Sequence, residues 1–361
     1  MTTKSVNLAI LGSGVVGTAY INQLRNLKFP ILFDVIYFAR SSKEALYNKD
    51  YKPISLDTYK TVEPKAILSL NDLLEYLKVS GKPTILVDNT SNTSVADSYS
   101  KFVKEGISIA TPNKKAFSSS LNEWDEIFKN SETPGGGLVY HESTVGAGLP
   151  IIGPLKDMIT TNDKIEKIEG IFSGTLSYIF NEFSAANSTK EARFSDIVKV
   201  AKSLGYTEPD PRDDLNGLDV ARKVTILARI SGLKVESPTS FPIQSLIPEQ
   251  LKSVTDADQF LSKLPDFDGE IQKLNEEALA ENKVLRFVGL CDVKNQKTSV
   301  QIEKYGFDHP FASLKGSDNV IAIKSERYSN PLIIQGAGAG ADVTAHGVLS
   351  DTIKIAERIA K

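Results

Sequence analysis

The sequence predicts an α/β fold, with a doubly wound parallel sheet followed by an α+β domain that contains an open sheet. Two observations support this prediction: an apolar run near the N-terminus leads straight into a glycine-rich turn and a helix, and strand-like pairs follow several helices later in the chain. A chain of 361 residues fits two domains, because single cores stop growing near about 250–300 residues. We expect one domain to comprise residues 1–150 plus 341–361 and the other to comprise residues 151–340.

Composition is ordinary for a globular protein, with 41% hydrophobic and 24% charged residues. The net charge of −3 gives no basic footprint for nucleic acid, and no apolar run approaches the ~20 residues that span a bilayer. The single cysteine, Cys291, excludes an internal disulfide framework and favours a reducing compartment. A strand begins within a few residues of Met1 and leaves no room for a targeting peptide. We therefore expect a cytoplasmic protein that binds neither nucleic acid nor membranes.

The N-terminal strand is Val6–Leu11, and it is followed by a G-x-G-x-x-G turn and a helical stretch over Thr18–Leu27. In this context the first glycine permits the tight turn, the second lets the backbone approach a pyrophosphate, and the third lets helix and strand pack closely. The helix N-terminus adds free N–H groups and partial positive charge. The pattern predicts a Rossmann-type dinucleotide site rather than a purely structural turn, formed by Gly12, Ser13, Gly14, Val15, Val16 and Gly17.

Cofactor choice depends on the residues after the second strand, Phe33–Phe38. An NAD site usually places Asp or Glu there to bind the ribose 2′-hydroxyl, whereas this chain has Arg40, with Lys43 close behind. A guanidinium suits a 2′-phosphate. We therefore favour NADP, with NAD as a possible second cofactor; the alternative is that Arg40 is an ordinary surface arginine.

Polar residues follow two further strands, Thr84–Val87 and Ser108–Ala110. The first strand leads into Thr90 and Ser91, and the second leads into Lys114. Ligands of a doubly wound sheet lie just beyond the carboxyl ends of its strands, so these three residues are candidates for a binding site. A surface lysine at a helix start is the alternative for Lys114.

Late in the chain, a second glycine cluster from Gly336 to Gly340 precedes an amphipathic helix over Val343–Ile359. A glycine turn that opens a helix repeats the arrangement that cradles phosphates, so Gly340 is a further cofactor candidate. The alternative is a tight connection with no ligand. Within the second domain, we expect a helix over Ser195–Gly205 with a serine cap and a glycine stop.

The segment Ala201–Lys223 sets five acidic side chains and a lysine around two prolines and two glycines. A helix is expected from Leu218 to Ile230, and it places Asp219 and Lys223 four residues apart on one face. So much charge on a stiff loop suits a small molecule that carries an ammonium group. The plain alternative is a solvated loop whose salt bridge contributes a few tenths of a kcal/mol.

The order of residues in this segment carries a family resemblance. The string A-x3-G-Y-T-x2-D-P-x2-D-L-x-G-x-D-x3-K runs from Ala201 to Lys223 and resembles the signature of homoserine dehydrogenases at every specified position. The resemblance extends over almost the whole chain and is closest to the short, monofunctional fungal enzymes. It implies NAD(P)H-dependent reduction of L-aspartate 4-semialdehyde to L-homoserine, in threonine and methionine biosynthesis. It also implies a homodimer whose second domain binds substrate and supplies the dimer surface.

The resemblance also implies roles for individual residues. Lys223 would be the main acid, and Lys114 would share the proton transfer or hold the substrate carboxylate. The implied substrate-binding residues are Glu208, Asp214, Asp219, Lys223, Gly174, Thr175 and Tyr206. The turn Ser143–Pro150 would bind a monovalent cation such as sodium through Glu142, Val145, Ala147 and Leu149; a plain structural loop is the alternative.

The implied chemistry fits these residue types. When hydride reaches the aldehyde carbon, negative charge develops on its oxygen, and a lysine ammonium beside that oxygen can stabilise the charge and supply the proton. A thioester mechanism would need an activated cysteine, and the apolar strand around Cys291 argues against it. Dehydrogenation of an amino group stays open, and a non-catalytic dinucleotide sensor would leave the acidic residues and lysine idle.

Overall fold

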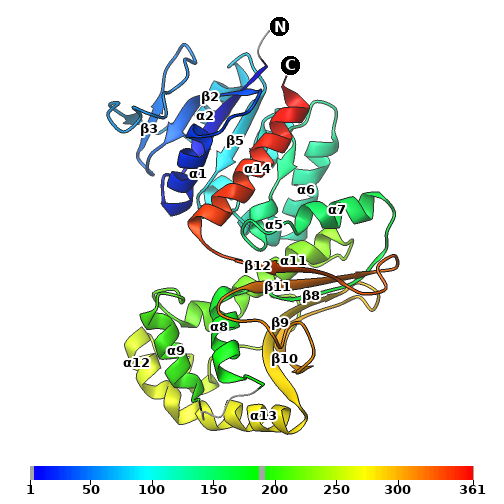
Figure 1. Cartoon of the computed structure of the whole chain (residues 1–361). Helices are drawn as coiled ribbons and strands as arrows, with labels where there is room; N and C mark the ends of the chain where they lie inside the picture. Colours follow the sequence, from blue (N-terminus) through cyan, green and yellow to red (C-terminus); the bar gives the residue numbers. More distant parts are fainter. Residues whose placement is uncertain (1–3, 187–191, 361) are drawn as a thin grey trace. The chain divides into compact units, whose positions relative to one another are not determined.

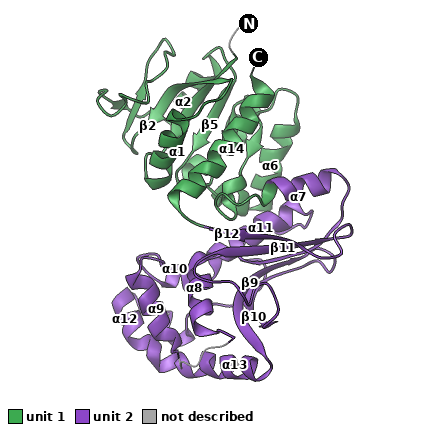
Figure 2. Cartoon of the chain, in the orientation of Figure 1, with its two compact units in different colours: residues 1–152, 339–361 green, residues 153–338 purple. Residues whose placement is uncertain are grey.

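The computed structural model describes residues 4–186 and 192–360. The chain divides into two compact units, unit 1 comprising Met1–Ile152 with Ala339–Lys361 and unit 2 comprising Gly153–Gly338 (Figure 2). Each unit has a sheet of its own with helices packed against it (Figure 1). The assignment of one unit to dinucleotide binding and of the other to substrate binding and dimerisation stays a prediction.

Unit 1 is built on a seven-stranded sheet of order β4-β3-β2-β1-β5-β6-β7. Neighbouring strands among β2, β1, β5, β6 and β7 run parallel, which confirms the predicted parallel sheet. The antiparallel edge strands β3 and β4 were not anticipated, because they have only four and two residues and no sustained alternation. The strands are β1 (Ser5–Leu11), β2 (Leu32–Ala39), β3 (Glu44–Tyr47), β4 (Lys65–Ala66), β5 (Thr84–Asp88), β6 (Ser108–Ala110) and β7 (Val139–Tyr140).

Both faces of this sheet are covered. On β1, Leu8 and Ile10 pack into a core that includes residues of α1 and α14, while Asn7 and Ala9 on the opposite face are buried as well. Near-continuous burial of this kind is what a parallel sheet between helix layers requires. The helical segments of unit 1 are α1 (Val15–Arg25), α2 (Leu70–Lys78), α3 (Thr93–Ala96), α4 (Tyr99–Lys104), α5 (Lys115–Ser118), α6 (Leu121–Glu132), η1 (Glu142–Thr144) and α14 (Ala341–Ile359).

Unit 2 contains a five-stranded antiparallel sheet of order β10-β9-β8-β11-β12. Its strands are β8 (Ile165–Ile171), β9 (Lys283–Asp292), β10 (Lys297–Gly306), β11 (Asn319–Ser325) and β12 (Leu332–Gly336). The predicted open sheet of the α+β domain is therefore confirmed. Helix α7 (Ile152–Thr160) precedes β8, and the remaining helical segments are α8 (Gly174–Phe183), α9 (Phe194–Ser203), α10 (Arg212–Leu215), α11 (Leu218–Ile230), η2 (Glu249–Leu251), α12 (Ala257–Lys263), η3 (Leu264–Phe267) and α13 (Asp268–Ala280).

The expected serine cap of α9 is wrong. Arg193 occupies the N-cap position without a side-chain cap, and Ser195 lies inside the first turn, where its hydroxyl donates to the Asp268 carboxylate over 2.6 Å. The local pattern predicted that this hydroxyl caps the helix, but it bonds instead to a residue that is distant in the sequence. The glycine stop holds, because Gly205 follows the C-cap with a φ of +73°.

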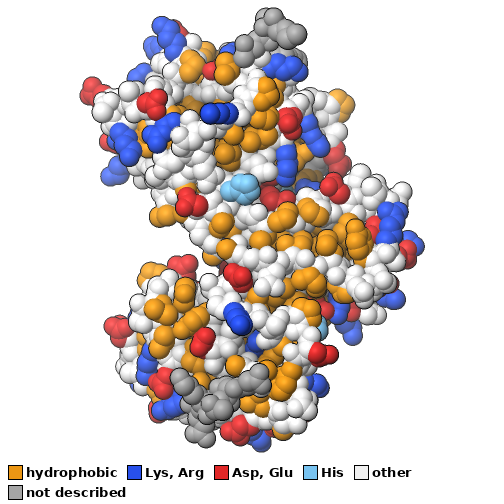
Figure 3. Space-filling view, viewed as in Figure 1, with side chains coloured by type: hydrophobic (Ala, Val, Ile, Leu, Met, Phe, Trp, Pro, Cys, Tyr) orange, Lys and Arg blue, Asp and Glu red, His pale blue; other side chains and the backbone are white. Residues whose placement is uncertain are grey.

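Surface charge is mixed on the described residues of the face drawn in Figure 3, where basic and acidic side chains alternate without forming a continuous basic patch. This agrees with the net charge of −3. No helix in the described ranges combines the length and apolar character needed to cross a bilayer.

Arg286 on β9 is the largest fully buried side chain of the described residues. Its guanidinium donates to five main-chain carbonyls, at distances of 2.7 to 3.2 Å, and these belong to Phe180, Ser184, Leu285, Phe311 and Ala312. Burial lowers its pKa to about 10. The cation also lies at the C-terminal end of α8, where the helix dipole favours positive charge. Arg286 therefore joins β9, the end of α8 and the loop before β11.

We expect Arg286→Leu to lower the free energy of unfolding by about 3–5 kcal/mol, because several buried carbonyls lose their donor at once. The matched control is Arg25→Leu. The Arg25 side chain is 44% exposed and its Nε lies 4.0 Å from Asp57 Oδ1, so its loss should cost less than about 1 kcal/mol. Urea unfolding followed by circular dichroism measures both. Similar losses for the two variants would contradict the role assigned to Arg286.

Candidate active site

The glycine-rich turn between β1 and α1 has the geometry that the motif predicts. Gly12 has a φ of +91°, and a Cβ on Gly17 would lie 2.1 Å from the Gly12 carbonyl oxygen, so neither position accepts a side chain without strain. A Cβ on Gly14 would instead meet nothing within 4 Å. Gly14 is the N-cap of α1 and offers no side-chain cap, which leaves the first N–H groups of the helix for a ligand. The open space at Gly14 and the N–H groups without a capping side chain suit the binding of a pyrophosphate.

The end of β2 lies beside this turn. The Ser13 hydroxyl donates to the Arg40 carbonyl, which ties the glycine-rich turn to the residue after β2. Arg40 is half-buried, and its guanidinium donates to the Val62 carbonyl over 3.3 Å. Val15 and Val16 follow in the first turn of α1, and Val15 is 78% exposed. The structure therefore groups the predicted residues of the turn with Arg40.

Thr90 also reaches the glycine-rich turn, since a Cβ on Gly12 would lie 2.9 Å from the Thr90 methyl carbon. Its backbone N–H donates to the Asp88 carboxylate over 2.8 Å, and Ser91 beside it is exposed. Lys114 is half-buried at the N-cap of α5. Each residue follows the carboxyl end of a parallel strand, as predicted.

Gly340 is the N-cap of α14 and has a φ of +119°, a conformation that side chains rarely adopt. Its carbonyl accepts bonds from the Thr344 N–H and hydroxyl, at 3.0 and 2.7 Å. Helix α14 packs alongside α1 in the same unit (Figure 1). The second glycine cluster thus opens a helix that neighbours the helix of the first.

Sequence reasoning missed Asn89, which directly follows β5. Its backbone N–H donates to the Leu11 carbonyl over 2.8 Å, which places it beside the glycine-rich turn. Both polar atoms of its side-chain amide are buried and have no hydrogen-bond partner within the described ranges. Buried polar groups are usually hydrogen-bonded, so a bound ligand that pairs with this amide would explain why it has no partner. The signal in the sequence was its position in the D-N-T-S cluster.

The turn after β7 carries the predicted cation ligands. Glu142 is buried, and its Oε1 accepts bonds from the N–H groups of Ile151 and Ile152 at 2.7 and 2.6 Å. Ala147 is buried with a φ of +54°, directly after Gly146 with a φ of +75°. Val145 is buried and Leu149 is half-buried in the same turn. No group of three His, Cys, Asp or Glu side chains in the described ranges could hold a metal ion. A carboxylate and main-chain carbonyls are ligand types that a hard monovalent cation prefers, and the cation site stays a prediction.

Lys223 is one of the predicted substrate residues in unit 2. Only 8% of it is exposed, and its Nζ donates to Asp219 Oδ2 and to the Phe172 carbonyl, both over 2.7 Å. Asp219 and Lys223 lie one turn apart on α11, which begins as predicted after Gly217. Phe172 directly follows β8. The ammonium group is therefore fixed between a helix and a strand end, unlike that of a solvated surface lysine.

A second cluster forms at the start of α8. The Thr175 hydroxyl lies 2.6 Å from the Tyr206 carbonyl and 2.8 Å from Asp214 Oδ1, and the Glu208 N–H donates to Asp214 Oδ2 over 2.8 Å. Gly174 precedes Thr175 as the first residue of α8. The structure thus brings together five predicted residues from two distant parts of the sequence.

Burial raises the pKa of Asp214, and the negative charges of Glu208 and Asp219 add to the rise. The hydrogen atoms available for these contacts are also consistent with a raised pKa of Asp214. Thr175 has one hydroxyl hydrogen but two neighbouring oxygen acceptors, so a protonated Asp214 would satisfy both contacts by donating to Thr175. The surroundings of Asp214 therefore raise the proton affinity of its carboxylate.

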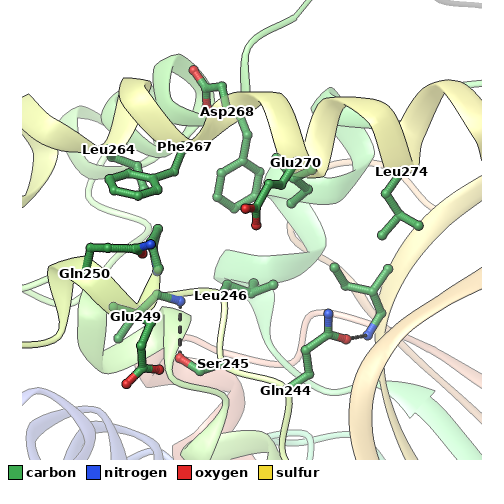
Figure 4. A pocket seen from close by; sticks show the side chains of 15 residues that line it. Gln244, Ser245, Leu246, Glu249, Gln250, Leu264, Phe267, Asp268, Glu270 and Leu274 are labelled. Atoms are coloured by element: carbon green, nitrogen blue, oxygen red, sulfur yellow. Dashed lines mark hydrogen bonds between the residues drawn. The ribbon is translucent and has the colours of Figure 1, made fainter.

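Three features lie apart from this chemistry. A cavity of about 570 Å³ in unit 2 lies between residues 244–250 and the segment from Leu264 to Leu274 (Figure 4), and none of the predicted substrate residues lines it. Cys291 is 1% exposed, and burial raises its pKa to about 12, which rules against its use as a thiolate nucleophile. His141 stacks on Phe117 at 4.3 Å between ring centroids and serves packing.

The fold of unit 1 and its glycine-rich turn define an NAD(P)-dependent oxidoreductase, and comparisons with known proteins identify the kind. A family model described as homoserine dehydrogenase matches residues 150–353, and one described as homoserine dehydrogenase, NAD binding domain, matches residues 12–141. The chain belongs to the homoserine dehydrogenase family. This confirms the predicted family, fold class and type of enzyme.

Individual relatives cover nearly the whole chain. Homoserine dehydrogenase of Saccharomyces cerevisiae is 60% identical over 99% of this chain and 100% of its own length, and that of Schizosaccharomyces pombe is 53% identical over 98% and 96%. A crystal structure of a Candida auris protein of unknown function has a TM-score of 0.98 at 65% identity, covering 99% of this chain and 100% of its own. A hyperthermophilic archaeal homoserine dehydrogenase in complex with NADPH has a TM-score of 0.73 at 25% identity, with 98% of both chains covered.

Proposed function

We propose that the protein catalyses the NAD(P)H-dependent reduction of L-aspartate 4-semialdehyde to L-homoserine, and the reverse reaction, in the synthesis of threonine and methionine. The names of its relatives support this reaction. The observation that carries the proposal is the buried ammonium of Lys223, held by Asp219 and the Phe172 carbonyl within the family signature. A fixed cation of this kind can stabilise an oxygen on which negative charge develops.

Unit 1 binds the cofactor in this proposal. Its pyrophosphate would lie on Gly12–Gly17 and the N-terminus of α1, with further contacts from Thr90, Ser91, Lys114 and Gly340. When bound, the nicotinamide supplies or accepts the hydride. The position of Arg40 beside the glycine-rich turn supports a preference for NADP, because a guanidinium pairs well with a 2′-phosphate.

Unit 2 binds the amino-acid substrate. The carboxylates of Glu208, Asp214 and Asp219 would hold its ammonium group, and the turn at Gly174 and Thr175 would present donors to its polar atoms. During reduction Lys223 stabilises the forming alkoxide and donates a proton to it; in the reverse direction it takes the proton back. Lys114 would share the proton transfer or hold the substrate carboxylate.

Two further proposals concern assembly and ions. Glu142 and the carbonyls of Val145, Ala147 and Leu149 would bind a monovalent cation such as sodium. Hydrophobic side chains gather over the sheet of unit 2 in Figure 3, and Ile333 on β12 is 39% exposed, which supports a homodimer that uses this sheet. A cytoplasmic location stays a prediction.

Lys223→Ala should lower kcat for aldehyde reduction by roughly 10²–10⁴, the range for loss of one general acid. Steady-state kinetics with L-aspartate 4-semialdehyde and NADPH measure it. Lys202→Ala is the matched control, because its ammonium pairs with the exposed Asp258 at 2.9 Å and should leave kcat unchanged. A folded Lys223→Ala variant with near-normal kcat would refute the role of Lys223.

Arg40→Ala should raise KM for NADPH by about 10-fold or more while changing KM for NADH far less, because only NADPH loses a charge-assisted bond. Parallel kinetics with the two nucleotides measure this. Arg25→Ala, an exposed arginine on α1, is the control. Equal effects of Arg40→Ala on both nucleotides would dismiss the 2′-phosphate contact.

The raised pKa of Asp214 predicts a pH effect on homoserine oxidation. Ammonium binding needs the ionised carboxylate, so kcat/KM for homoserine should fall as pH is lowered through this pKa, above the usual aspartate value near 3.9. Asp214→Asn should remove this acid limb, and Asp213→Asn, at an exposed neighbour, should keep it. An unchanged limb in Asp214→Asn would assign it to another group.

A further inference from the structure

Unit 1 contains a buried carboxylate that the proposed mechanism does not use. Asp88 ends β5 and is 0% exposed, and no lysine or arginine is among the described groups that influence its pKa. Three donors converge on its side chain: the Thr90 N–H at 2.8 Å on Oδ1, with the Tyr99 hydroxyl at 2.5 Å and the Asn113 amide at 3.1 Å on Oδ2. We call Asp88, Tyr99, Thr111 and Asn113 the Asp88 network.

The network joins the loops after β5 and β6. The Thr111 hydroxyl donates to the Asp88 carbonyl over 2.8 Å and accepts a bond from the Asn113 N–H over 2.9 Å. The Asn113 amide also donates to the Asn92 carbonyl over 3.0 Å. The side chains of Asp88 and Asn113 therefore bridge the loop that carries Thr90 and the loop that carries Lys114.

Asn113 also fixes the next two residues of its own loop. Its Oδ1 accepts a bond from the Lys115 N–H over 3.2 Å, at the start of α5. Lys114 lies between Asn113 and Lys115, so this hydrogen bond restrains the backbone of Lys114. Asp88 acts on Lys114 through Asn113, whereas it acts on Thr90 directly.

A charge at this position is expensive to bury. Burial raises the pKa of Asp88, although its donors partly offset the rise. An unpaired buried carboxylate costs free energy that a neutral side chain of the same shape would not, so stability alone gives little reason for an aspartate here. Three donors directed at one carboxylate do explain an aspartate at this position, because charge-assisted hydrogen bonds are shorter and more directional than neutral ones.

We propose that Asp88 is a positioning residue for cofactor binding, whose carboxylate holds the loops of Thr90 and Lys114 in the spacing that receives the cofactor. The inference rests on the proposed function for the roles of Thr90 and Lys114. It predicts a loss of cofactor affinity that exceeds any loss of stability.

The first test is direct titration with NADPH, followed by nucleotide fluorescence. Asp88→Asn keeps the size of the side chain and removes its charge, and it should raise Kd for NADPH by about 10-fold or more. Its melting temperature should change by only a few degrees, because relief of the buried charge offsets the weakened hydrogen bonds. KM for NADPH should rise with Kd.

A matched pair of Tyr→Phe variants separates positioning from general loosening. Tyr99→Phe removes one donor to Asp88 and keeps the ring that packs near Phe117 at 5.9 Å. Tyr20→Phe removes an equally buried hydroxyl, whose partner is Thr352 at 3.1 Å in a contact between α1 and α14. Tyr99→Phe should weaken NADPH binding several-fold, and Tyr20→Phe should leave it unchanged.

Normal NADPH binding by Asp88→Asn, or equal effects of the two Tyr→Phe variants, would each overturn the proposal. Because the readout is binding of NADPH alone, a wild-type protein that binds NADPH but reduces no aldehyde would refute the proposed function and leave this test intact.

Discussion

The ion pair between Lys223 and Asp219, with the Phe172 carbonyl as third member, is the contact on which the account of unit 2 depends. Close packing makes it possible. A Cβ on Gly289 of β9 would lie 2.5 Å from Val224 of α11 and 3.0 Å from the Phe172 ring, so the glycine lets helix, strand end and sheet approach one another. The left-handed conformation of Gly217 then starts α11 in the direction that points Lys223 at this strand end.

In unit 1 as well, glycines allow a helix and a strand to approach closely. Glycines at positions 12 and 17 let β1 and α1 approach so closely that a side chain at Gly17 would overlap the Gly12 carbonyl. The backbone then presents N–H groups that a side chain would block. In both units, a missing side chain lets a helix and a strand approach closely. In the proposed function, the charged side chains of Arg40 and Lys223 would decide which ligand binds beside them.

Local patterns predicted much of this. The strand and glycine-rich turn at Gly12–Gly17 and the helix from Leu218 to Ile230 were readable because apolar periodicity and glycine spacing act over a few residues. The partner of Ser195 was not readable, because Asp268 lies 73 residues away in the sequence and took the hydroxyl that would cap a helix. Short edge strands such as Lys65–Ala66 leave no periodicity to find.

The site shows the same division between local and distant information. The spacing of Asp219 and Lys223 predicted their pairing, whereas the approach of Thr175 to Asp214, 39 residues apart, followed only from the resemblance. Asn89 and the Asp88 network were missed because burial and hydrogen-bond satisfaction depend on strands that meet only in the folded sheet. Residue types were visible in the sequence; which polar groups lack partners was not.

A crystal structure of the protein with NADP⁺ and L-homoserine bound would show whether the Lys223 ammonium contacts the reacting oxygen. We expect the Lys223 Nζ to lie within about 3.2 Å of the homoserine hydroxyl oxygen, with Asp219 still paired to the Lys223 ammonium. A structure in which that hydroxyl is held by other groups, while Lys223 contacts only Asp219 and the Phe172 carbonyl, would contradict it.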